Sequence, residues 1–370
     1  MRSKKLSLEL TAVLVIFAVI VLAAGTRAVA QEEKLLHVFD GKNGNSPFAS
    51  LIMDASGNLY GTTWMGGAYN CGAVFELTPA EGGGWTEKIL HNFNNNGTDG
   101  YSPYANLIFD GSGNLYGTTE QGGGRNGGVV FELTPKFAGG WAEKILHSFN
   151  NVDSTGGYFL EAGLIFEGSG NLYGTARSGG AYGGGVVFEL SHKAGGGWTE
   201  QVLHSFADNG TDGYYPLGSL IFDASGNLYG TTETGGNGTA CDPVGCGMVF
   251  ELTPTGGEDW TENVLYNFGN GGDGTTPYAG LIFDGAGNLY GTTLSGGLWN
   301  YGTAFELTAG TGGSWTETVL HSFGLGTDAS FPLPALSSTL PAISTALQRG
   351  ATATGSCSSY RVKWVAVGPR

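Results

Sequence analysis

Residues 107–135 read LIFDGSGNLYGTTEQGGGRNGGVVFELTP, and this stretch decides the fold. Short runs rich in β-branched and aromatic residues alternate with clusters of Gly, Asp and Asn, a pattern typical of strands joined by tight turns. The turn at 110–114 suits Asp as a cap and Gly as the residue with positive φ. With the segment that follows, we predict four strands, at Asn106–Asp110, Leu115–Thr119, Gly128–Thr134 and Trp141–Phe149.

The same pattern occurs five times along the chain. The phrase Leu-Tyr-Gly-Thr begins at spacings of 56, 57, 56 and 61 residues, at Leu59, Leu115, Leu172, Leu228 and Leu289. A period near 56 with four short strands matches a propeller blade better than a β-helix coil or a leucine-rich repeat. No stretch after residue 30 has helical periodicity. We therefore predict an all-β fold, a β-propeller of four-stranded blades with five complete repeats and a sixth that is truncated.

Both ends of the repeat region bear on how the ring closes. Residues 34–39 match the end of a fourth strand at 88–93, so we expect this segment to complete the last blade and remove a free sheet edge. A sixth unit begins at His321 but its pattern stops after Leu336. When residues 337–370 are back-translated with permitted codons and the triplets are read one base earlier, the missing repeat phrases reappear. We interpret 337–370 as an aberrant, out-of-frame and disordered tail; a distinct C-terminal domain is the alternative.

The first thirty residues predict export. Arg2, Lys4 and Lys5 precede an apolar run at 10–24, and Ala28-Val29-Ala30 fits a cleavage site. We expect a signal peptide at 1–30, a propeller domain at 31–336 and an extracytoplasmic, secreted or cell-surface protein. An uncleaved membrane anchor is the alternative, but the apolar run is short for a bilayer span. We expect no transmembrane segment after cleavage.

Composition narrows the possible partners. The chain has 68 Gly among 370 residues, only 13% charged residues and 12% aromatic residues, which fits a turn-dense β protein rather than collagen or a disordered chain. The formal net charge is −16. A chain this acidic repels nucleic acid and anionic lipid, so neither is expected to be a partner.

The succession of Leu-Ile-Phe-Asp, Gly-Asn-Leu-Tyr-Gly-Thr-Thr, Val-Phe-Glu-Leu-Thr-Pro and Trp-Thr-Glu resembles the GloVer tandem repeat of exported bacterial proteins, over residues 35–336. The resemblance implies a surface or secreted location and often an interchangeable C-terminal anchor. It implies no activity and no catalytic residue. This chain departs from the pattern because it has no recognisable anchor.

The cysteines and histidines predict a disulfide but no metal site. Cys241 lies in an insertion in the fourth unit and Cys246 follows it closely, so we predict a disulfide between them; a Cys71–Cys246 contact is the alternative. Five histidines share one repeat position, where the fourth unit ends instead with Tyr266: they are His37, His91, His147, His204 and His321. Since equivalent positions in different blades lie far apart, these histidines cannot converge on one ion, and we expect neither a metal nor a cofactor.

Two sets of loops are expected on one face of the ring. One set joins consecutive units and has Asp at matching positions; the other joins the second and third strands and has varied aromatic residues. Variable side chains on a repeated scaffold suit ligand recognition. The candidate ligand-binding residues are Trp64, Tyr69, Asp99, Tyr182, Asp212, Asp273, Trp299 and Tyr301. Asp and Asn that only form turns are the alternative. Calcium binding by these loops is left open, although none has the spacing of a dedicated calcium loop.

Three hypotheses for the function follow. The first is a binding or interaction module outside the cytoplasm, with carbohydrate or a surface protein as its ligand. The second is a purely structural surface protein. The third is a glycan-active enzyme with its site at the central channel, which requires a blade-specific acidic or His residue near the axis; His192, Glu161 and Asp242 depart from the repeat but fall in apparent loops. We favour the first hypothesis and predict no catalytic residue.

Overall fold

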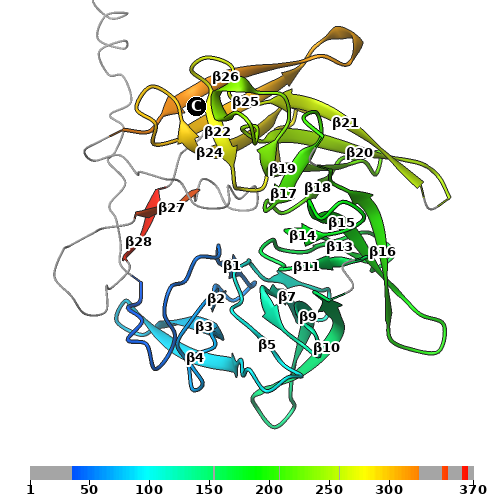
Figure 1. Cartoon of the computed structure of the whole chain (residues 1–370). Helices are drawn as coiled ribbons and strands as arrows, with labels where there is room; N and C mark the ends of the chain where they lie inside the picture. Colours follow the sequence, from blue (N-terminus) through cyan, green and yellow to red (C-terminus); the bar gives the residue numbers. More distant parts are fainter. Residues whose placement is uncertain are drawn as a thin grey trace, which may run out of the picture. The chain divides into compact units, whose positions relative to one another are not determined.

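The computed structural model describes residues 36–152, 155–207, 209–257, 259–324, 344–348 and 361–365. The predicted signal peptide at 1–30 and most of the predicted tail at 337–370 lie outside these residues. Five antiparallel sheets form a five-bladed β-propeller (Figure 1). The prediction of an all-β propeller with four-stranded blades is confirmed.

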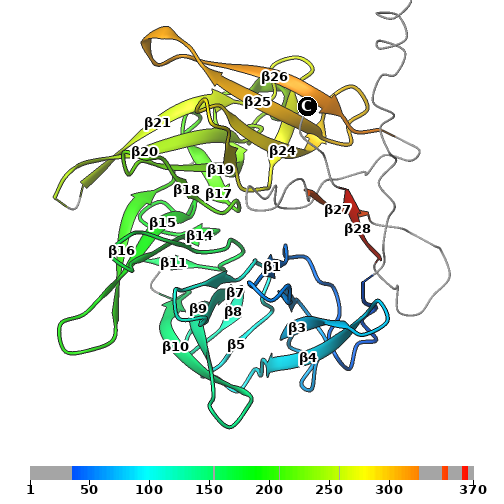
Figure 2. The same ribbon diagram turned by 180° about the vertical axis from the view of Figure 1, so that it is seen from behind.

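Each blade contains four antiparallel strands that run in sequence order from the axis outwards (Figures 1 and 2). Blade 1 contains β1 (Ile52–Met53), β2 (Leu59–Thr63), β3 (Ala73–Ala80) and β4 (Gly84–Asn92); blade 2 contains β6 (Ile108–Phe109), β7 (Leu115–Thr119), β9 (Asn126–Pro135) and β10 (Trp141–Asn150); blade 3 contains β12 (Ile165–Phe166), β13 (Leu172–Ala176), β15 (Val186–His192) and β16 (Trp198–Ser205); blade 4 contains β18 (Ile221–Phe222), β19 (Leu228–Gly235), β20 (Met248–Gly256) and β21 (Asp259–Asn267); blade 5 contains β23 (Ile282–Phe283), β24 (Leu289–Gly296), β25 (Thr303–Ala309) and β26 (Trp315–Ser322).

Shorter elements complete the description. Blades 2 to 5 each have an additional short strand at their inner edge. In blades 2 and 3 it pairs with a second short strand: β5 (Gly100–Tyr101) with β8 (Gln121–Gly122), and β11 (Gly157–Tyr158) with β14 (Ser178–Gly179). In blades 4 and 5 the additional strands are β17 (Gly213–Pro216) and β22 (Gly274–Pro277), which pair with β19 and β24. Two 3₁₀ turns are η1 (Thr239–Cys241) and η2 (Thr311–Gly313), and β27 (Ser344–Gln348) pairs antiparallel with β28 (Arg361–Val365). No helix in the described part of the chain is long and apolar enough to cross a membrane.

The acidic turn between the first two strands is held by its Asp. In blade 2, Asp110 Oδ1 accepts hydrogen bonds from the backbone N–H of Ser112 and Asn114 at 2.8 and 2.9 Å. The Tyr116 hydroxyl lies 3.3 Å from Asp110 Oδ2 and 3.1 Å from Glu132 Oε1. The Asp of the turn and the Glu of Val-Phe-Glu-Leu therefore serve the scaffold, which accounts for their recurrence in the repeats.

Consecutive blades pack through hydrophobic clusters that draw residues from both. Between blades 1 and 2 the fully buried Phe93 contacts Phe131 edge-on, with ring centroids 5.2 Å apart. A Cβ added to Gly117 of Leu-Tyr-Gly-Thr would lie 2.6 Å from Phe131 Cζ, so only Gly fits there. Across the next junction, Thr118 Oγ1 donates to the Ala162 carbonyl at 2.9 Å. These contacts explain why the repeat phrase is kept from blade to blade.

The outward face of blade 5 differs from the same face of the other blades. Leu203 in blade 3 is 7% exposed, whereas Leu320 at the same position in blade 5 is 51% exposed. Phe323 is only partly buried, whereas its equivalents at the ends of the first four blades are fully buried. Hydrophobic clusters of the described residues fill the junctions from blade 1 to blade 5 in order, and none joins blade 5 to blade 1.

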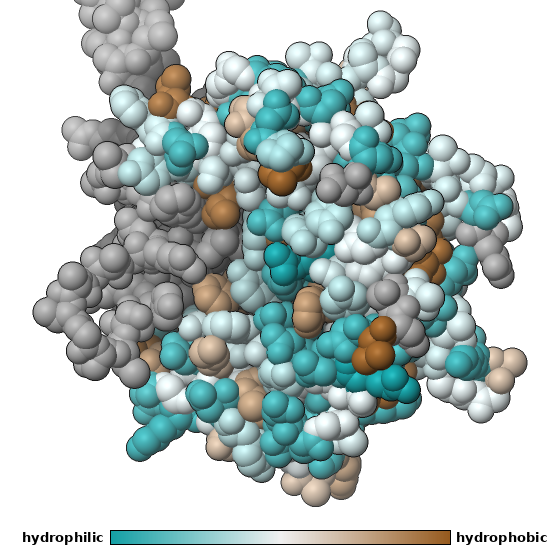
Figure 3. Space-filling view, in the orientation of Figure 1, coloured by the Kyte–Doolittle hydropathy of each residue, from teal (hydrophilic) through white to brown (hydrophobic). Residues whose placement is uncertain are grey.

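The face of the molecule that is turned towards the viewer in Figure 1 is mostly hydrophilic or neutral (Figure 3). Its hydrophobic side chains are scattered among polar ones instead of forming one continuous patch (Figure 3). Isolated apolar side chains are normal on a protein surface, whereas a large contiguous patch marks a docking site. The hydrophobic residues of the blades are therefore mainly used inside the junctions.

Residues 36–40 lie against blade 1 but do not form the predicted outer strand. Phe39 contacts Phe75 edge-on with ring centroids 4.9 Å apart, which repeats the contact between Phe93 and Phe131. His37 Nε2 lies 3.3 Å from Glu87 Oε2. The segment thus makes the contacts that the end of a preceding blade makes elsewhere, without pairing as a strand.

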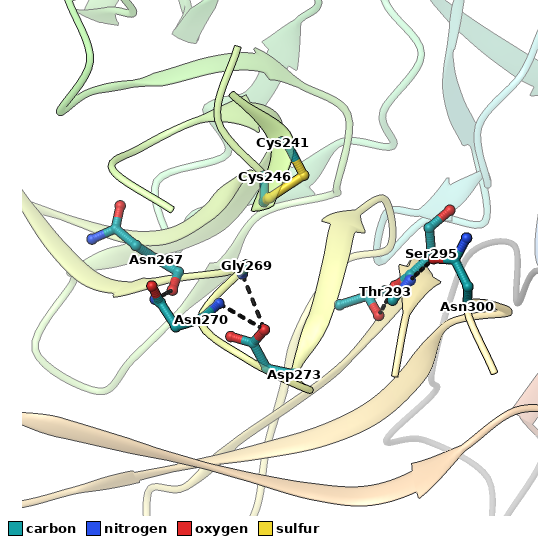
Figure 4. The surroundings of a disulfide bond; sticks show 10 residues. Cys241, Cys246, Asn267, Gly269, Asn270, Asp273, Thr293, Ser295 and Asn300 are labelled. Carbon is teal, nitrogen blue, oxygen red and sulfur yellow. Dashed lines mark hydrogen bonds between the residues drawn. A yellow bond between two sulfur atoms is a disulfide. The ribbon is translucent and has the colours of Figure 1, made fainter. Parts of the chain in front are cut away.

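The insertion in blade 4 contains a disulfide between Cys241 and Cys246 (Figure 4). Cys241 ends η1, and Cys246 is 1% exposed and belongs to the cluster between blades 4 and 5. Cys71 is a free cysteine. The disulfide ties the tip of the insertion to the core of the propeller.

Candidate functional site

A cavity of about 350 Å³ lies on the propeller axis and is lined by the first strand of every blade. The lining residues form three successive layers along the axis. In the first layer all five blades contribute Ile, in the second they contribute small or amide residues, and in the third the residue types differ most between blades. These layers are, in order, Ile52, Ile108, Ile165, Ile221 and Ile282; then Ser50, Asn106, Gly163, Ser219 and Gly280; then Tyr104, Glu161, Leu217 and Tyr278. The repeats therefore diverge towards one end of the axis.

A repeated backbone kink precedes the divergent layer. The residue two positions before it has φ between 57 and 62° in all five blades, although none of the five is Gly: Ser46, Ser102, Phe159, Tyr215 and Thr276. Such a conformation costs free energy and persists only where surrounding bonds enforce it. Tyr215 N–H, for example, donates to the Gly184 carbonyl of the preceding blade at 2.8 Å.

The kink also fixes a second ring of variable residues. Trp64, Glu120 and Arg177 each follow the second strand of their blade, and their backbone N–H groups donate to the kink residue of the same blade at 3.0, 3.1 and 2.9 Å. Glu233 and Leu294 occupy this position in blades 4 and 5. Each blade thus presents two side chains that change from repeat to repeat beside the axis.

The two sets of variable residues, one before the first strands and one after the second strands, contact one another beside the axis. The Tyr278 hydroxyl lies 3.3 Å from both Glu161 Oε2 and the Tyr104 hydroxyl, so that blades 2, 3 and 5 meet at this point. Arg177 Nε lies 3.7 Å from Glu161 Oε1. Trp64 Nε1 of blade 1 donates to Glu120 Oε2 of blade 2 at 3.0 Å. We call the seven residues Trp64, Tyr104, Glu120, Glu161, Arg177, Glu233 and Tyr278 the axial cluster.

Burial and neighbouring charges set the protonation of the axial cluster. Desolvation by burial raises the pKa of Glu161 to about 7; Arg177 opposes this shift, and the carboxylates of Glu120 and Glu233 add to it. Burial also raises the pKa of Glu233, against the pull of Arg177. The cluster therefore holds three carboxyls and one guanidinium, with one carboxyl close to half-protonated at neutral pH. Such a set both donates and accepts hydrogen bonds.

The structure places the predicted ligand-binding residues in three environments. Trp64 belongs to the axial cluster. Tyr69, Tyr182 and Trp299 lie in loops between the second and third strands and are 57%, 68% and 63% exposed; Tyr301 follows in the last of these loops and is partly buried. These loops belong to blades 1, 3 and 5, whereas Trp64 is directed to Glu120 beside the axis. The exposed loop aromatics therefore stand apart from Trp64.

The three predicted loop aspartates stabilise their own loops. Asp99 and Asp273 are 8% and 9% exposed. Asp99 Oδ2 and Asp212 Oδ2 accept backbone N–H groups at 2.9 and 2.8 Å. Asp273 Oδ1 accepts the N–H of Gly269 and Asn270 at 3.1 and 2.9 Å (Figure 4). These contacts fit the turn-forming role that was the alternative to ligand binding.

Most of the axial cluster was not predicted from the sequence. Glu161 departs from the repeat but falls in an apparent loop, whereas the structure places it at the axis. His192, the other unusual residue of blade 3, stacks against Trp198 with ring centroids 3.9 Å apart, and Asp242 lies in the insertion of blade 4. The available signal was the second residue after each Leu-Tyr-Gly-Thr phrase, which is Trp, Glu, Arg, Glu and Leu in the five repeats.

The fold and the axial cluster define a five-bladed β-propeller repeat protein with a polar, repeat-specific set of residues at one end of its axis. The chain belongs to the family described as the Gloeobacter/Verrucomicrobia repeat, whose model matches residues 26–241 and 138–360. The resemblance seen in the repeat phrases is thereby confirmed. No curated protein matches the chain.

Several solved structures are similar to the chain. A putative oxidoreductase (glucose dehydrogenase) from Thermus thermophilus is 15% identical with a TM-score of 0.53, over 90% of this chain and 99% of that one. A protein of unknown function from Dyadobacter fermentans is 15% identical with a TM-score of 0.48, over 82% and 90%. A family 43 arabinoxylan arabinofuranohydrolase from Bacillus subtilis is 15% identical with a TM-score of 0.41, over 80% and 71%. At these identities the likeness concerns the fold alone.

Proposed function

We propose that the protein is an exported binding module that takes a carbohydrate at the axial cluster. The observation that carries the proposal is the concentration of repeat-specific side chains at one end of the axial cavity. Sheets and turns that repeat from blade to blade have no structural need for a set of non-repeating polar and aromatic residues there. Loops and ends of repeat scaffolds are where recognition residues accumulate.

The chemistry of the axial cluster suits a sugar. Tyr104, Tyr278 and Glu161 line the axial cavity. Trp64 adds an indole beside Glu120, and Arg177 adds a donor beside Glu161, so the cluster offers aromatic rings and hydrogen-bonding groups of both kinds. Small-ligand sites combine apolar walls with a few convergent polar groups in a volume of about 300 to 1,000 Å³, and the cavity here has about 350 Å³. A neutral polyol satisfies the carboxyls without adding negative charge.

A pair of tryptophan variants tests where the ligand binds. A glycan array identifies the sugar, and calorimetry then compares Trp64→Ala with Trp299→Ala, which removes an exposed Trp from a loop away from the cluster. We expect Trp64→Ala to weaken binding at least tenfold and Trp299→Ala to leave it unchanged. The reverse result would move the site to the loops, and failure of the intact protein to bind any glycan would refute the proposal.

Export is supported by the residues at 1–30 and by the disulfide, since disulfides persist in oxidising compartments. The test is cell fractionation followed by N-terminal sequencing of the mature protein. We expect a mature N-terminus at residue 31 and recovery outside the cytoplasm. A cytoplasmic protein that retains residues 1–30 would contradict the proposal.

One observation favours a second candidate, a glycan-active enzyme. Glu161 has a pKa raised to about 7 and lies beside two further carboxyls, and glycosidases pair a protonated carboxyl with an ionised one. We prefer binding because the carboxyls of Glu120, Glu161 and Glu233 form one group of three, whereas a glycosidase uses one distinct acid–base pair. Release of reducing sugar from the array-identified glycan, abolished by Glu161→Gln, would establish the enzyme instead.

A further inference from the structure

A second group of chemically reactive side chains lies away from the axis, where blade 1 meets blade 2. His91 is the penultimate residue of β4, Asp99 lies in the loop that follows, and Glu143 belongs to β10 of the next blade. His91 Nε2 lies 3.4 Å from Asp99 Oδ2 and 3.4 Å from Glu143 Oε1. One ligand atom from each residue lies within 4.8 Å of the others.

One atom of each residue in this cluster is buried and makes no hydrogen bond. His91 Nε2, Asp99 Oδ1 and Glu143 Oε1 are inaccessible to solvent and have no hydrogen-bond partner, and Asp99 as a whole is 8% exposed. Leaving a buried polar group unpaired is unfavourable, and more so when the group is charged. The Asp99 oxygen that lies 3.4 Å from His91 Nε2 is Oδ2, which accepts the Asn94 N–H. Unpaired atoms on three residues that converge on one point indicate that a further group satisfies them.

The separations fit a shared metal ion better than hydrogen bonds. A separation of 3.4 Å exceeds the usual 2.7–3.2 Å range of a hydrogen bond between nitrogen and oxygen, which is about 2.9 Å at its most frequent. Two ligands bound tetrahedrally to zinc at about 2.0–2.1 Å lie about 3.3–3.4 Å apart. The separations at His91 therefore match the edges of a zinc coordination tetrahedron.

The same arrangement recurs where blade 3 meets blade 4. His204 Nε2 lies 3.5 Å from Asp212 Oδ1 and 3.8 Å from Glu262 Oε1. His204 Nε2 and Glu262 Oε1 are again buried without a hydrogen-bond partner. The same three residue types at equivalent positions thus produce the same unsatisfied cluster at a second, separate junction.

Junctions that lack one of the three residue types pair their His or Tyr directly with the Asn or Asp, although Glu87 Oε1 and Glu317 Oε1 remain without a hydrogen-bond partner. At blade 1, Asn43 replaces the Asp and its Nδ2 contacts His37 Nε2 at 3.0 Å and also Glu87. At the junction of blades 4 and 5, Tyr266 replaces the His and donates to Asp273 Oδ2 at 2.9 Å.

The remaining junction has its His bonded to its Glu. His147 Nε2 lies 3.2 Å from Glu200 Oε2, within hydrogen-bond range; residues 153 and 154 of its loop lie outside the described part of the chain. Among the described residues, a buried imidazole Nε2 without a hydrogen-bond partner thus occurs only where His, Asp and Glu are all present.

We propose that each of the two His-Asp-Glu clusters binds one divalent transition-metal ion, with zinc as the preferred ion. An imidazole nitrogen with two carboxylates suits zinc, whereas calcium and magnesium favour ligand sets made of oxygen. Each ion joins a His and an Asp from one blade to a Glu from the next. The ions therefore act as clamps between blades and stand apart from the axial cluster.

The stoichiometry of zinc tests the proposal. Untagged full-length protein is dialysed against a chelator, equilibrated with zinc chloride at micromolar concentration and analysed by elemental mass spectrometry. We expect about two ions per chain, because two clusters carry all three ligands. Zinc added to the chelated protein should also raise its melting temperature, because a ligand that binds only the folded state stabilises it.

Substitutions already present at equivalent positions of this chain provide variants that the fold tolerates. His91→Tyr copies Tyr266, and Asp99→Asn copies Asn43; each is expected to lower the count by one ion. His147→Tyr is the matched control and should leave the count unchanged. Tyr266→His completes a third set with Asp273 and Glu317 and should raise the count by one ion.

The outcomes separate the alternatives. A count below one ion per chain at about 100 µM zinc, far above the Kd of a structural zinc site, or two ions retained in both His91→Tyr and Asp99→Asn, overturns the proposal. If His91→Tyr alone misfolds by circular dichroism, Asp99→Asn and the gain of an ion in Tyr266→His still decide the question. A zinc-independent melting temperature would mean that the clusters share protons instead of a metal.

Discussion

The repeated junction predicts unequal effects for one substitution made at equivalent positions. Leu203 of blade 3 is 7% exposed and belongs to the cluster with Phe206 and Phe250, whereas Leu320 of blade 5 is 51% exposed. Leu→Ala removes three carbon atoms from either residue. The local strand and the neighbouring sequence are similar, so burial against the next blade is the main difference between the two positions.

The magnitudes follow from that burial. Removing three buried carbons at about 0.8 kcal/mol each costs about 2.4 kcal/mol, and the cavity left in a junction that cannot collapse raises the loss to about 3 kcal/mol for Leu203→Ala. At Leu320 half of the side chain already contacts water and no closed cavity forms. We expect a loss of about 1 kcal/mol for Leu320→Ala.

Urea denaturation followed by tryptophan fluorescence measures both free energies of unfolding, with Leu203→Met as a control that conserves volume. The slope with denaturant should stay the same in all variants, so that the midpoints report stability. Losses that agree within about 0.5 kcal/mol for Leu203→Ala and Leu320→Ala would refute the reasoning, because blade 5 would then be covered as tightly as blade 3.

Three further predictions concern single contacts. Burial raises the pKa of Glu161 to about 7 from 4.5, so the folded protein favours the protonated carboxyl. The resulting contribution to the free energy of unfolding is about 3 kcal/mol. It is fully present below about pH 4.5 and is lost as the pH rises through about 7. Thermal melts at about pH 5 and about pH 8 should show a smaller difference for Glu161→Gln than for the wild type. Thr118→Val removes the hydrogen bond to the Ala162 carbonyl and should cost about 1–2 kcal/mol in urea, with recovery in Thr118→Ser. Changing Cys241 and Cys246 together to Ser should cost about 2 kcal/mol, since the closed loop is short, and should make the melt insensitive to reductant.

The strands were predictable because their signals are local. The sequence predicts Leu115–Thr119 with the bounds that the structure gives, and the turn at Asp110 forms through the backbone contacts that its residue types favour. Strand ends were less predictable: the sequence indicates a strand at Asn106–Asp110, and β6 spans only Ile108–Phe109. Inner strands of a propeller pair on one side only, so tertiary contacts decide how far they extend.

The candidate site was less predictable because it depends on contacts between blades. The kink that aims Glu161 at the axis has a positive φ at Phe159, a residue type that gives no local signal for such a conformation. The prediction for His91 compared histidines with one another, but its neighbours are a loop Asp and a Glu from the next blade. Repeats reveal which positions are equivalent and conceal which of them meet across a junction.

The kinked main chain beside the axis separates what the protein recognises from what keeps it folded. Main-chain hydrogen bonds hold the kink residues and the residues after the second strands, so the course of the backbone beside the axis does not depend on which side chains it carries. Two such positions in each blade can accept new side chains while the turns, junctions and sheets stay unchanged. One scaffold of this design can thus acquire many specificities by exchanging a few side chains, and a variant library confined to these positions is the direct way to redirect it to new ligands.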